Sequence, residues 1–161
     1  MMKHVPSEKY SLAWFKLAEC VARGERERAL GVYKLLSHSI DDQAFALQLE
    51  GDLLLSFQDK DAAIKYEKAA QLYKKAQRFV EAAAVYEHLI ELQPDVDSHV
   101  VRLVSLYEIL NFSEKISEHV KDAVERFLHS QNRTKLNMFL TKLQDVSKEG
   151  YDLACRFVKE G

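Results

Sequence analysis

The sequence is short of the residues that build turns. Its 161 residues include only five glycines and two prolines. An all-β fold needs many tight turns, so this scarcity argues against one. No Gly/Ser-rich or Pro-rich stretch separates one part of the chain from another, and we therefore expect a single domain over residues 1–161.

The sequence is equally short of residue patterns that carry chemistry. Its two cysteines, Cys20 and Cys155, lie far apart without CxxC spacing, and we expect two reduced thiols packed as small hydrophobes. None of the six histidines forms an HExxH pair or has a cysteine nearby, which argues against a metal site. A nucleophile elbow, a P-loop and a GxGxxG loop are all absent from the sequence. We therefore expect no enzyme and no cofactor.

Charge and hydropathy argue against two further classes of protein. The formal net charge is −2, so no global basic field would hold a nucleic acid. No apolar run approaches the roughly 20 residues that span a bilayer, and the first eight residues contain no apolar core of signal-peptide length. We expect no membrane insertion and a cytoplasmic location.

Apolar residues recur with helical spacing along nearly the whole chain. This periodicity predicts nine helices, and the short loops between them make successive helices antiparallel. Gly24 ends the first helix, Pro94 ends the fifth, and Gly150 separates the eighth from the ninth. The expected helices cover 7–23, 25–39, 43–57, 60–77, 79–92, 98–110, a seventh that Ser113 caps, 133–146 and 151–159; Asp41 or Asp42, Asp59 or Asp61, and Asp95 or Asp97 cap the third, fourth and sixth.

A second pattern repeats after 34 residues. Tyr66, Ala69, Ala70 and Tyr73 recur as Val100, Leu103, Val104 and Tyr107. A period of this size is typical of helical repeat proteins, in which paired helices stack on their neighbours.

Residues 63–96 resemble the tetratricopeptide repeat, a helix–turn–helix unit. The resemblance is carried by Tyr66, Ala70, Tyr73, Ala82, Tyr86 and Pro94. It implies an all-α, right-handed α–α superhelix of about nine antiparallel helices with three to four repeats, at about 11–40, 63–96 and 97–130. Residues 43–62 are ambiguous in phase, and residues 133–160 form a C-terminal hairpin or cap. The Tyr66 segment also has a fainter likeness to the soluble attachment proteins of membrane fusion.

The resemblance implies that the first helix of each pair lines a concave groove. The co-chaperone subset of the family clamps a carboxylate with Lys and Asn on these helices, but Phe15, Glu19, Glu67 and Gln71 stand at those places, which argues against a chaperone tail as the ligand. The basic face of helix four is either such a groove or an ordinary solvated surface. The expected groove residues are Phe15, Glu19, Glu67, Lys68, Gln71, Lys74, Lys75, Arg78, Val101, Ser105 and Glu108.

The sequence thus predicts a protein–protein interaction scaffold or adaptor that binds a peptide or a partner domain in its concave groove. The alternative is a small chaperone of secreted substrates, similar to tetratricopeptide-type secretion chaperones. In either case the partner is a protein or peptide. The oligomeric state stays open, with a homodimer among the options.

Overall fold

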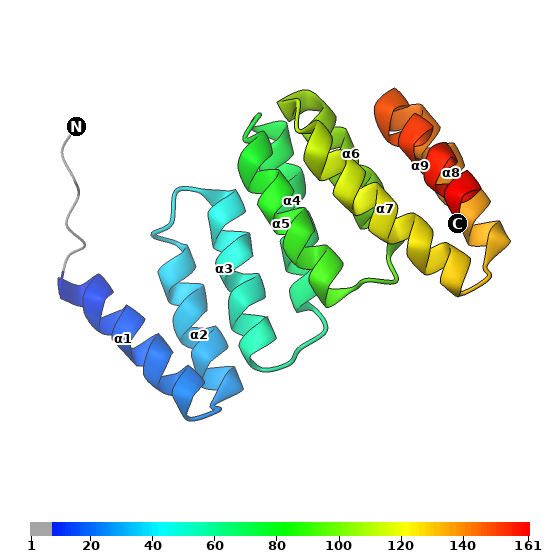
Figure 1. Ribbon diagram of the computed structural model, residues 1–161. Coiled ribbons are helices and arrows are strands. Elements are labelled where there is room, and N and C mark those ends of the chain that lie inside the picture. Colours follow the sequence, from blue (N-terminus) through cyan, green and yellow to red (C-terminus); the bar gives the residue numbers. More distant parts are fainter. Residues whose placement is uncertain (1–7) are drawn as a thin grey trace. The chain divides into compact units, whose positions relative to one another are not determined.

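A computed structural model describes residues 8–161 of the protein, with side chains from Leu12 onward (Figure 1). This part of the chain contains nine α-helices and no strand, which confirms the all-α prediction. The helices are α1 (Glu8–Ala22), α2 (Arg26–Ser37), α3 (Gln43–Ser56), α4 (Ala62–Lys75), α5 (Phe79–Leu92), α6 (Asp97–Leu110), α7 (Ser113–His129), α8 (Arg133–Val146) and α9 (Lys148–Glu160).

The contacts divide the chain into two compact units, residues 1–72 and 73–161. The division falls within α4, the first helix of the repeat expected at residues 63–96. We describe each unit by itself, as the N-terminal unit and the C-terminal unit.

In the N-terminal unit, α1 packs on α2 and α2 packs on α3. The hydroxyl of Tyr33 on α2 donates a hydrogen bond to the carbonyl of Ala46 on α3, and burial raises the pKa of Tyr33 to about 12. The buried centre between α1, α2 and α3 contains Leu17, Cys20, Ala29, Tyr33, Leu36 and Leu53.

The contact between α3 and the start of α4 depends on a glycine. A Cβ atom at Gly51 would stand 2.9 Å from Cε1 of Tyr66, closer than van der Waals contact allows. The Tyr66 hydroxyl donates to Asp52 Oδ1 at 2.6 Å, and Lys65 Nζ lies 2.7 Å from Glu50 Oε1. The close packing at this helix crossing therefore requires a residue without a side chain at position 51.

In the C-terminal unit, each of α5 to α8 packs on the next helix, and α6 also contacts α8 while α7 contacts α9. The hairpin α6/α7 therefore stacks on the hairpin α8/α9. Because neighbours surround α6 on several sides, half of its 14 residues are buried: His99, Val100, Val101, Leu103, Val104, Leu106 and Tyr107.

Several helices end in a residue with left-handed backbone geometry. Gly24 follows α1 with φ +70°, as its predicted role requires. Four further residues with positive φ follow α3, α4, α6 and α7, and none of them is a glycine. A side chain in this geometry costs roughly 1 kcal/mol relative to glycine. Local backbone hydrogen bonds close these turns nonetheless, as where the amide of Gln58 donates to the carbonyl of Leu55. The four are Gln58, Gln77, Asn111 and Gln131.

Some predicted helix boundaries are confirmed and others are wrong. Asp42 caps α3 by accepting the Phe45 amide, and α5 ends before Pro94 as predicted. The sixth helix is different: Val96 occupies the N-cap of α6 without a side-chain hydrogen bond, and Asp97 is already helical. Ser113 is likewise the first residue of α7, after the N-cap Phe112. Neither of these two helix starts has a side-chain cap.

Gly150 does not separate the last two helices, because it lies in the first turn of α9. The N-cap is Ser147, whose Oγ accepts the Gly150 amide at 2.8 Å and donates to Glu108 on α6. A Cβ atom at Gly150 would stand 3.0 Å from Val104 Cγ1. A side chain at this position would therefore crowd Val104 on α6.

Candidate functional site

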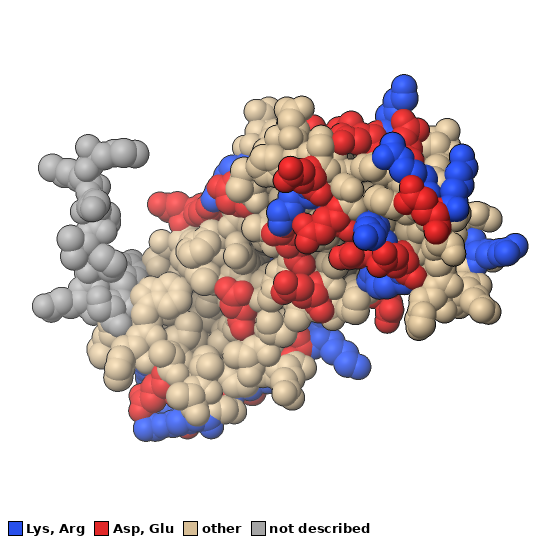
Figure 2. Space-filling model, viewed as in Figure 1, with Lys and Arg blue, Asp and Glu red and all other residues tan. Residues whose placement is uncertain are grey.

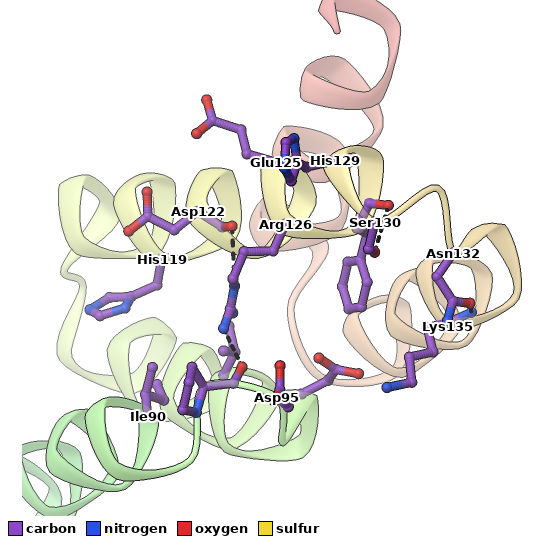
Figure 3. A pocket seen from close by; sticks show the side chains of 14 residues that line it. Ile90, Asp95, His119, Asp122, Glu125, Arg126, His129, Ser130, Asn132 and Lys135 are labelled. Atoms are coloured by element: carbon purple, nitrogen blue, oxygen red, sulfur yellow. Dashed lines mark hydrogen bonds between the residues drawn. The ribbon is translucent and has the colours of Figure 1, made fainter.

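A hollow of about 940 Å³ opens on the C-terminal unit (Figure 3). The corner between α5 and α6 forms one wall, α7 the opposite wall, and the start of α8 closes one end. This volume is in the range that holds a small molecule or a short piece of peptide. The lining residues are Ile90, Pro94, Asp95, Asp97, Val100, His119, Asp122, Glu125, Arg126, Phe127, His129, Ser130, Asn132 and Lys135.

Arg126 reaches across the hollow from α7 to the loop that carries Asp95, as Figure 3 shows. Its Nη1 donates to the carbonyl of Pro94, and its Nε donates to the carbonyl of Asp122 at 3.4 Å. Both acceptors are backbone atoms, so the guanidinium ties the α5–α6 corner to α7 without neutralising a carboxylate.

The hollow has an excess of acidic side chains. Asp95, Asp97 and Asp122 take part in no ion pair among the described residues. Glu125 forms a long, exposed ion pair on α7, with its Oε1 at 3.8 Å from Lys121 Nζ. Burial raises the pKa of Asp97, an effect that the nearby positive charges of Lys135 and Arg126 oppose. Four carboxyl groups against two cations leave the lining suited to a positively charged group.

A polar network borders the other end of the hollow. Glu87 on α5 accepts a hydrogen bond from the Tyr107 hydroxyl, and Lys115 Nζ and His119 Nε2 lie 3.5 and 3.9 Å from the same carboxylate oxygen. Burial and the Glu87 carboxylate raise the pKa of Tyr107. These contacts fix the ring of His119, whose centroid lies 5.8 Å from that of Tyr107.

The floor of the hollow includes the apolar side chains of Ile90, Val100 and Phe127. Among the described residues, no group of three His, Cys, Asp or Glu is placed to hold a metal ion. The combination of an apolar floor and an acidic rim fits recognition of a side chain with an apolar stem and a cationic end, such as Lys or Arg.

The residues predicted to line a groove on α1 and α4 lie at the surface of the N-terminal unit. Phe15 and Glu19 are exposed on α1, and Glu19 pairs with Arg23 one turn later. On α4, Lys68 and Gln71 are exposed and Glu67 is half-buried. Exposure alone does not distinguish a binding groove from an ordinary surface, so the groove on these two helices stays a prediction.

The predicted groove residues between the end of α4 and the start of α5 differ in how many contacts their side chains make. Lys74 and Lys75 are exposed at the end of α4. The guanidinium carbon of Arg78 lies 4.5 Å from the centroid of the Tyr73 ring, and Arg78 Nε lies 2.9 Å from Glu81 Oε1.

The groove residues predicted on α6 are partly or wholly covered, and their role in binding stays a prediction. Val101 is buried, with 7% of its surface exposed, and Glu108 accepts the hydrogen bond from the cap residue Ser147. Ser105 is half-buried and donates to the carbonyl of Arg102. The reason is that α6 packs against α5, α7 and α8 together, which leaves it little free surface.

The hollow itself was missed by the sequence analysis, which considered only the first helix of each pair. Half of its residues come from α7 and the turn that follows it, and the others from the α5–α6 corner and the start of α8. A signal for it exists in the sequence: Asp122, Glu125, Arg126 and His129 follow the spacing i, i+3, i+4 and i+7 of one helix face. That spacing does not distinguish a hollow from an ordinary solvated face.

Within residues 8–161, none of the helices has the combination of length and apolar character that crossing a bilayer requires. Comparison of the chain with protein-family models, with curated proteins and with solved structures gives no match.

Proposed function

We propose that the protein is a protein–protein interaction scaffold or adaptor, built as a tetratricopeptide-type solenoid, that holds a segment of a partner chain. Two features support this proposal. Stacked hairpins, such as α6/α7 on α8/α9, are the building principle of helical repeat proteins. The hollow beside α7 is the feature of the C-terminal unit into which a peptide fits.

The observation that carries the proposal is the chemistry of this hollow. Partial burial raises the pKa of Asp97, because it disfavours the charged carboxylate. A cation beside Asp97 would therefore stabilise its charged form. Asp95 and Asp122 lie in the same lining without an ion-pair partner among the described residues. The segment that fits is an extended peptide that carries Lys or Arg next to an apolar residue.

A selection from a displayed library of random peptides tests this directly. The immobilised wild-type protein is compared with the double variant Asp97→Asn/Asp122→Asn. The matched control is Asp145→Asn/Asp152→Asn, which removes the same charge from two exposed positions on α8 and α9. Circular dichroism establishes that all three proteins are folded.

We expect the wild type and the control to enrich peptides with Lys or Arg, and we expect the hollow variant to lose them. For a synthetic peptide from the selection, the dissociation constant should rise about tenfold or more in the hollow variant. Enrichment of the same peptides by all three proteins, or of none by the wild type, would contradict the proposal.

A further inference from the structure

The hollow of the C-terminal unit is crossed by a cation that belongs to the chain itself. Arg126 is half-buried and extends from α7 to the α5–α6 corner. In Figure 3 its side chain lies between His119 and Lys135, which also line the hollow. Arg126 therefore takes up space in the middle of the hollow, where a bound side chain would otherwise lie.

The contacts that hold Arg126 in this position are modest. Its Nη1 donates to the carbonyl of Pro94, and its Nε donates to the carbonyl of Asp122 at 3.4 Å, which is long for a hydrogen bond. Both bonds are exposed to water, and an exposed hydrogen bond contributes little net free energy because water can replace it. The Arg126 side chain can thus leave the hollow at little cost.

The carboxyl groups of the hollow remain available to a cation from a ligand. Among the described residues, no ion pair joins Arg126 to Asp95 or Asp97. The positive charges of Lys135 and Arg126 both favour the charged form of Asp97. A ligand cation in the place of Arg126 would keep this stabilisation, whereas a ligand cation beside Arg126 would be repelled by it.

Recognition of this cation depends on short-range contacts inside the hollow. On the face of the C-terminal unit that Figure 2 shows, acidic and basic side chains are intermixed, so no field of one sign covers that face. The geometry of the hydrogen-bond donors then decides which cation fits. A guanidinium carries donors on Nε and on both Nη atoms in a rigid fork, while an ammonium is a compact charge on a flexible stem.

We propose that the hollow selects an arginine of the bound peptide, and that this arginine displaces Arg126 and takes over its contact with the Pro94 carbonyl. The inference rests on the proposed function, because it concerns a peptide in the same hollow, and it narrows the ligand from Lys or Arg to Arg. Arg126 acts as an internal competitor. The peptide binds only the fraction of molecules in which Arg126 has moved out, so the apparent affinity is lowered by that fraction.

Two capped dipeptides test the proposal on the full chain: acetyl-leucyl-arginine amide and acetyl-leucyl-lysine amide. Each carries one positive charge next to one apolar side chain. Nuclear magnetic resonance titration of the isotope-labelled protein gives their dissociation constants, which we expect on the order of 1 mM for such small ligands. The wild type is compared with Arg126→Met and Arg126→Lys. Arg133→Met is the matched control, because Arg133 is exposed on α8 and does not line the hollow.

The expected gain in affinity follows from the loss of the competitor. The wild type should bind the arginine dipeptide at least about threefold more tightly than the lysine dipeptide. Arg126→Met should bind the arginine dipeptide about three- to fivefold more tightly than the wild type. Arg126→Lys should gain about twofold, because it keeps the positive charge but loses the Nε donor. Arg133→Met should bind like the wild type.

A second readout locates the bound arginine. Arg126→Met frees the Pro94 carbonyl and should speed amide hydrogen exchange in residues 93–97. The arginine dipeptide at saturation should slow this exchange back toward the wild-type rate, and the lysine dipeptide should slow it less. A dipeptide bound elsewhere on the protein would leave the exchange fast.

The outcomes separate this inference from the proposed function. Binding of neither dipeptide by the wild type or any variant would contradict the proposed function itself. If the wild type binds the arginine dipeptide and Arg126→Met binds it no more tightly, the proposed function stands and displacement of Arg126 is refuted. A gain in Arg126→Met without any gain in Arg126→Lys also refutes displacement, because the effect is then one of charge alone. Equal affinities for the two dipeptides would refute the selection of arginine.

Discussion

The backbone of Gly51 on α3 lies directly against the ring of Tyr66 on α4, with no room for a side chain between them. A Cβ atom at position 51 would come within 2.9 Å of the ring. The ring itself is held, since Tyr66 is 1% exposed and its hydroxyl is bonded to Asp52. Two helices are thus joined by a contact that only glycine permits.

The first prediction concerns this contact. Gly51→Ala should lower the free energy of unfolding by about 1–2 kcal/mol, because overpacking against a fixed ring outweighs the gain of about 1 kcal/mol in helix propensity. Gly31→Ala is the matched control: it lies within α2, and a Cβ atom there meets nothing within 4 Å. It should raise stability by about 0.5–1 kcal/mol. Urea denaturation measures both, and equal effects of the two variants would contradict the close packing.

The second prediction separates a true helix cap from an apparent one. Ser147→Ala should cost about 1–2 kcal/mol, since it removes the cap of α9 and the bond to Glu108 at a buried position. Ser113→Ala should cost less than about 0.5 kcal/mol, because Ser113 caps nothing and its bond to Glu149 is exposed. Thermal denaturation of the two variants checks this, and a larger loss for Ser113→Ala would reverse the assignment.

The third prediction tests the role of Arg126 in the hollow. Arg126→Met removes the bond to the Pro94 carbonyl and should speed amide hydrogen exchange in residues 93–97, with a loss of stability of about 0.5–1 kcal/mol. Arg133→Met, at an exposed position on α8, removes the same charge and should leave that exchange unchanged. If both variants behave alike, the guanidinium does not hold the α5–α6 corner.

The fourth prediction is a pH dependence. His99 is 3% exposed, its Nε2 lies 3.1 Å from Gln93 Oε1, and its Nδ1 has no hydrogen-bond partner among the described residues. Burial lowers the pKa of His99 in the folded protein. The unfolded chain therefore takes up a proton at a higher pH than the folded one, and stability falls as the pH drops below about 6.5.

Denaturation between about pH 8 and pH 5 measures this effect, because the window spans the ordinary pKa of histidine. His99→Gln should show a weaker decline in stability toward low pH than the wild type. His129→Gln, at an exposed position on α7, should decline like the wild type. Identical declines for the wild type and His99→Gln would show that His99 does not carry the dependence.

The helix positions could be read from the sequence with good accuracy, whereas the features of the site could not. The fifth and eighth helices begin and end where the apolar spacing places them, because that spacing is a local property of the chain. The acidic hollow combines Asp97 from one hairpin corner with Asp122 from another helix, and no local pattern joins two such residues. Val101 shows the same limit, because an apolar residue on a helix does not reveal how many neighbours will cover it.

By itself, the sequence determined an all-α protein and the approximate bounds of its helices. These follow from side-chain spacing and backbone preference, which act within a few residues. Only the tertiary structure decided that Gly150 lies inside a helix, that α6 is enclosed, and that the outer face of α1 stays exposed. Those outcomes depend on which helices pack together, and helix packing is an interaction between segments far apart in the chain.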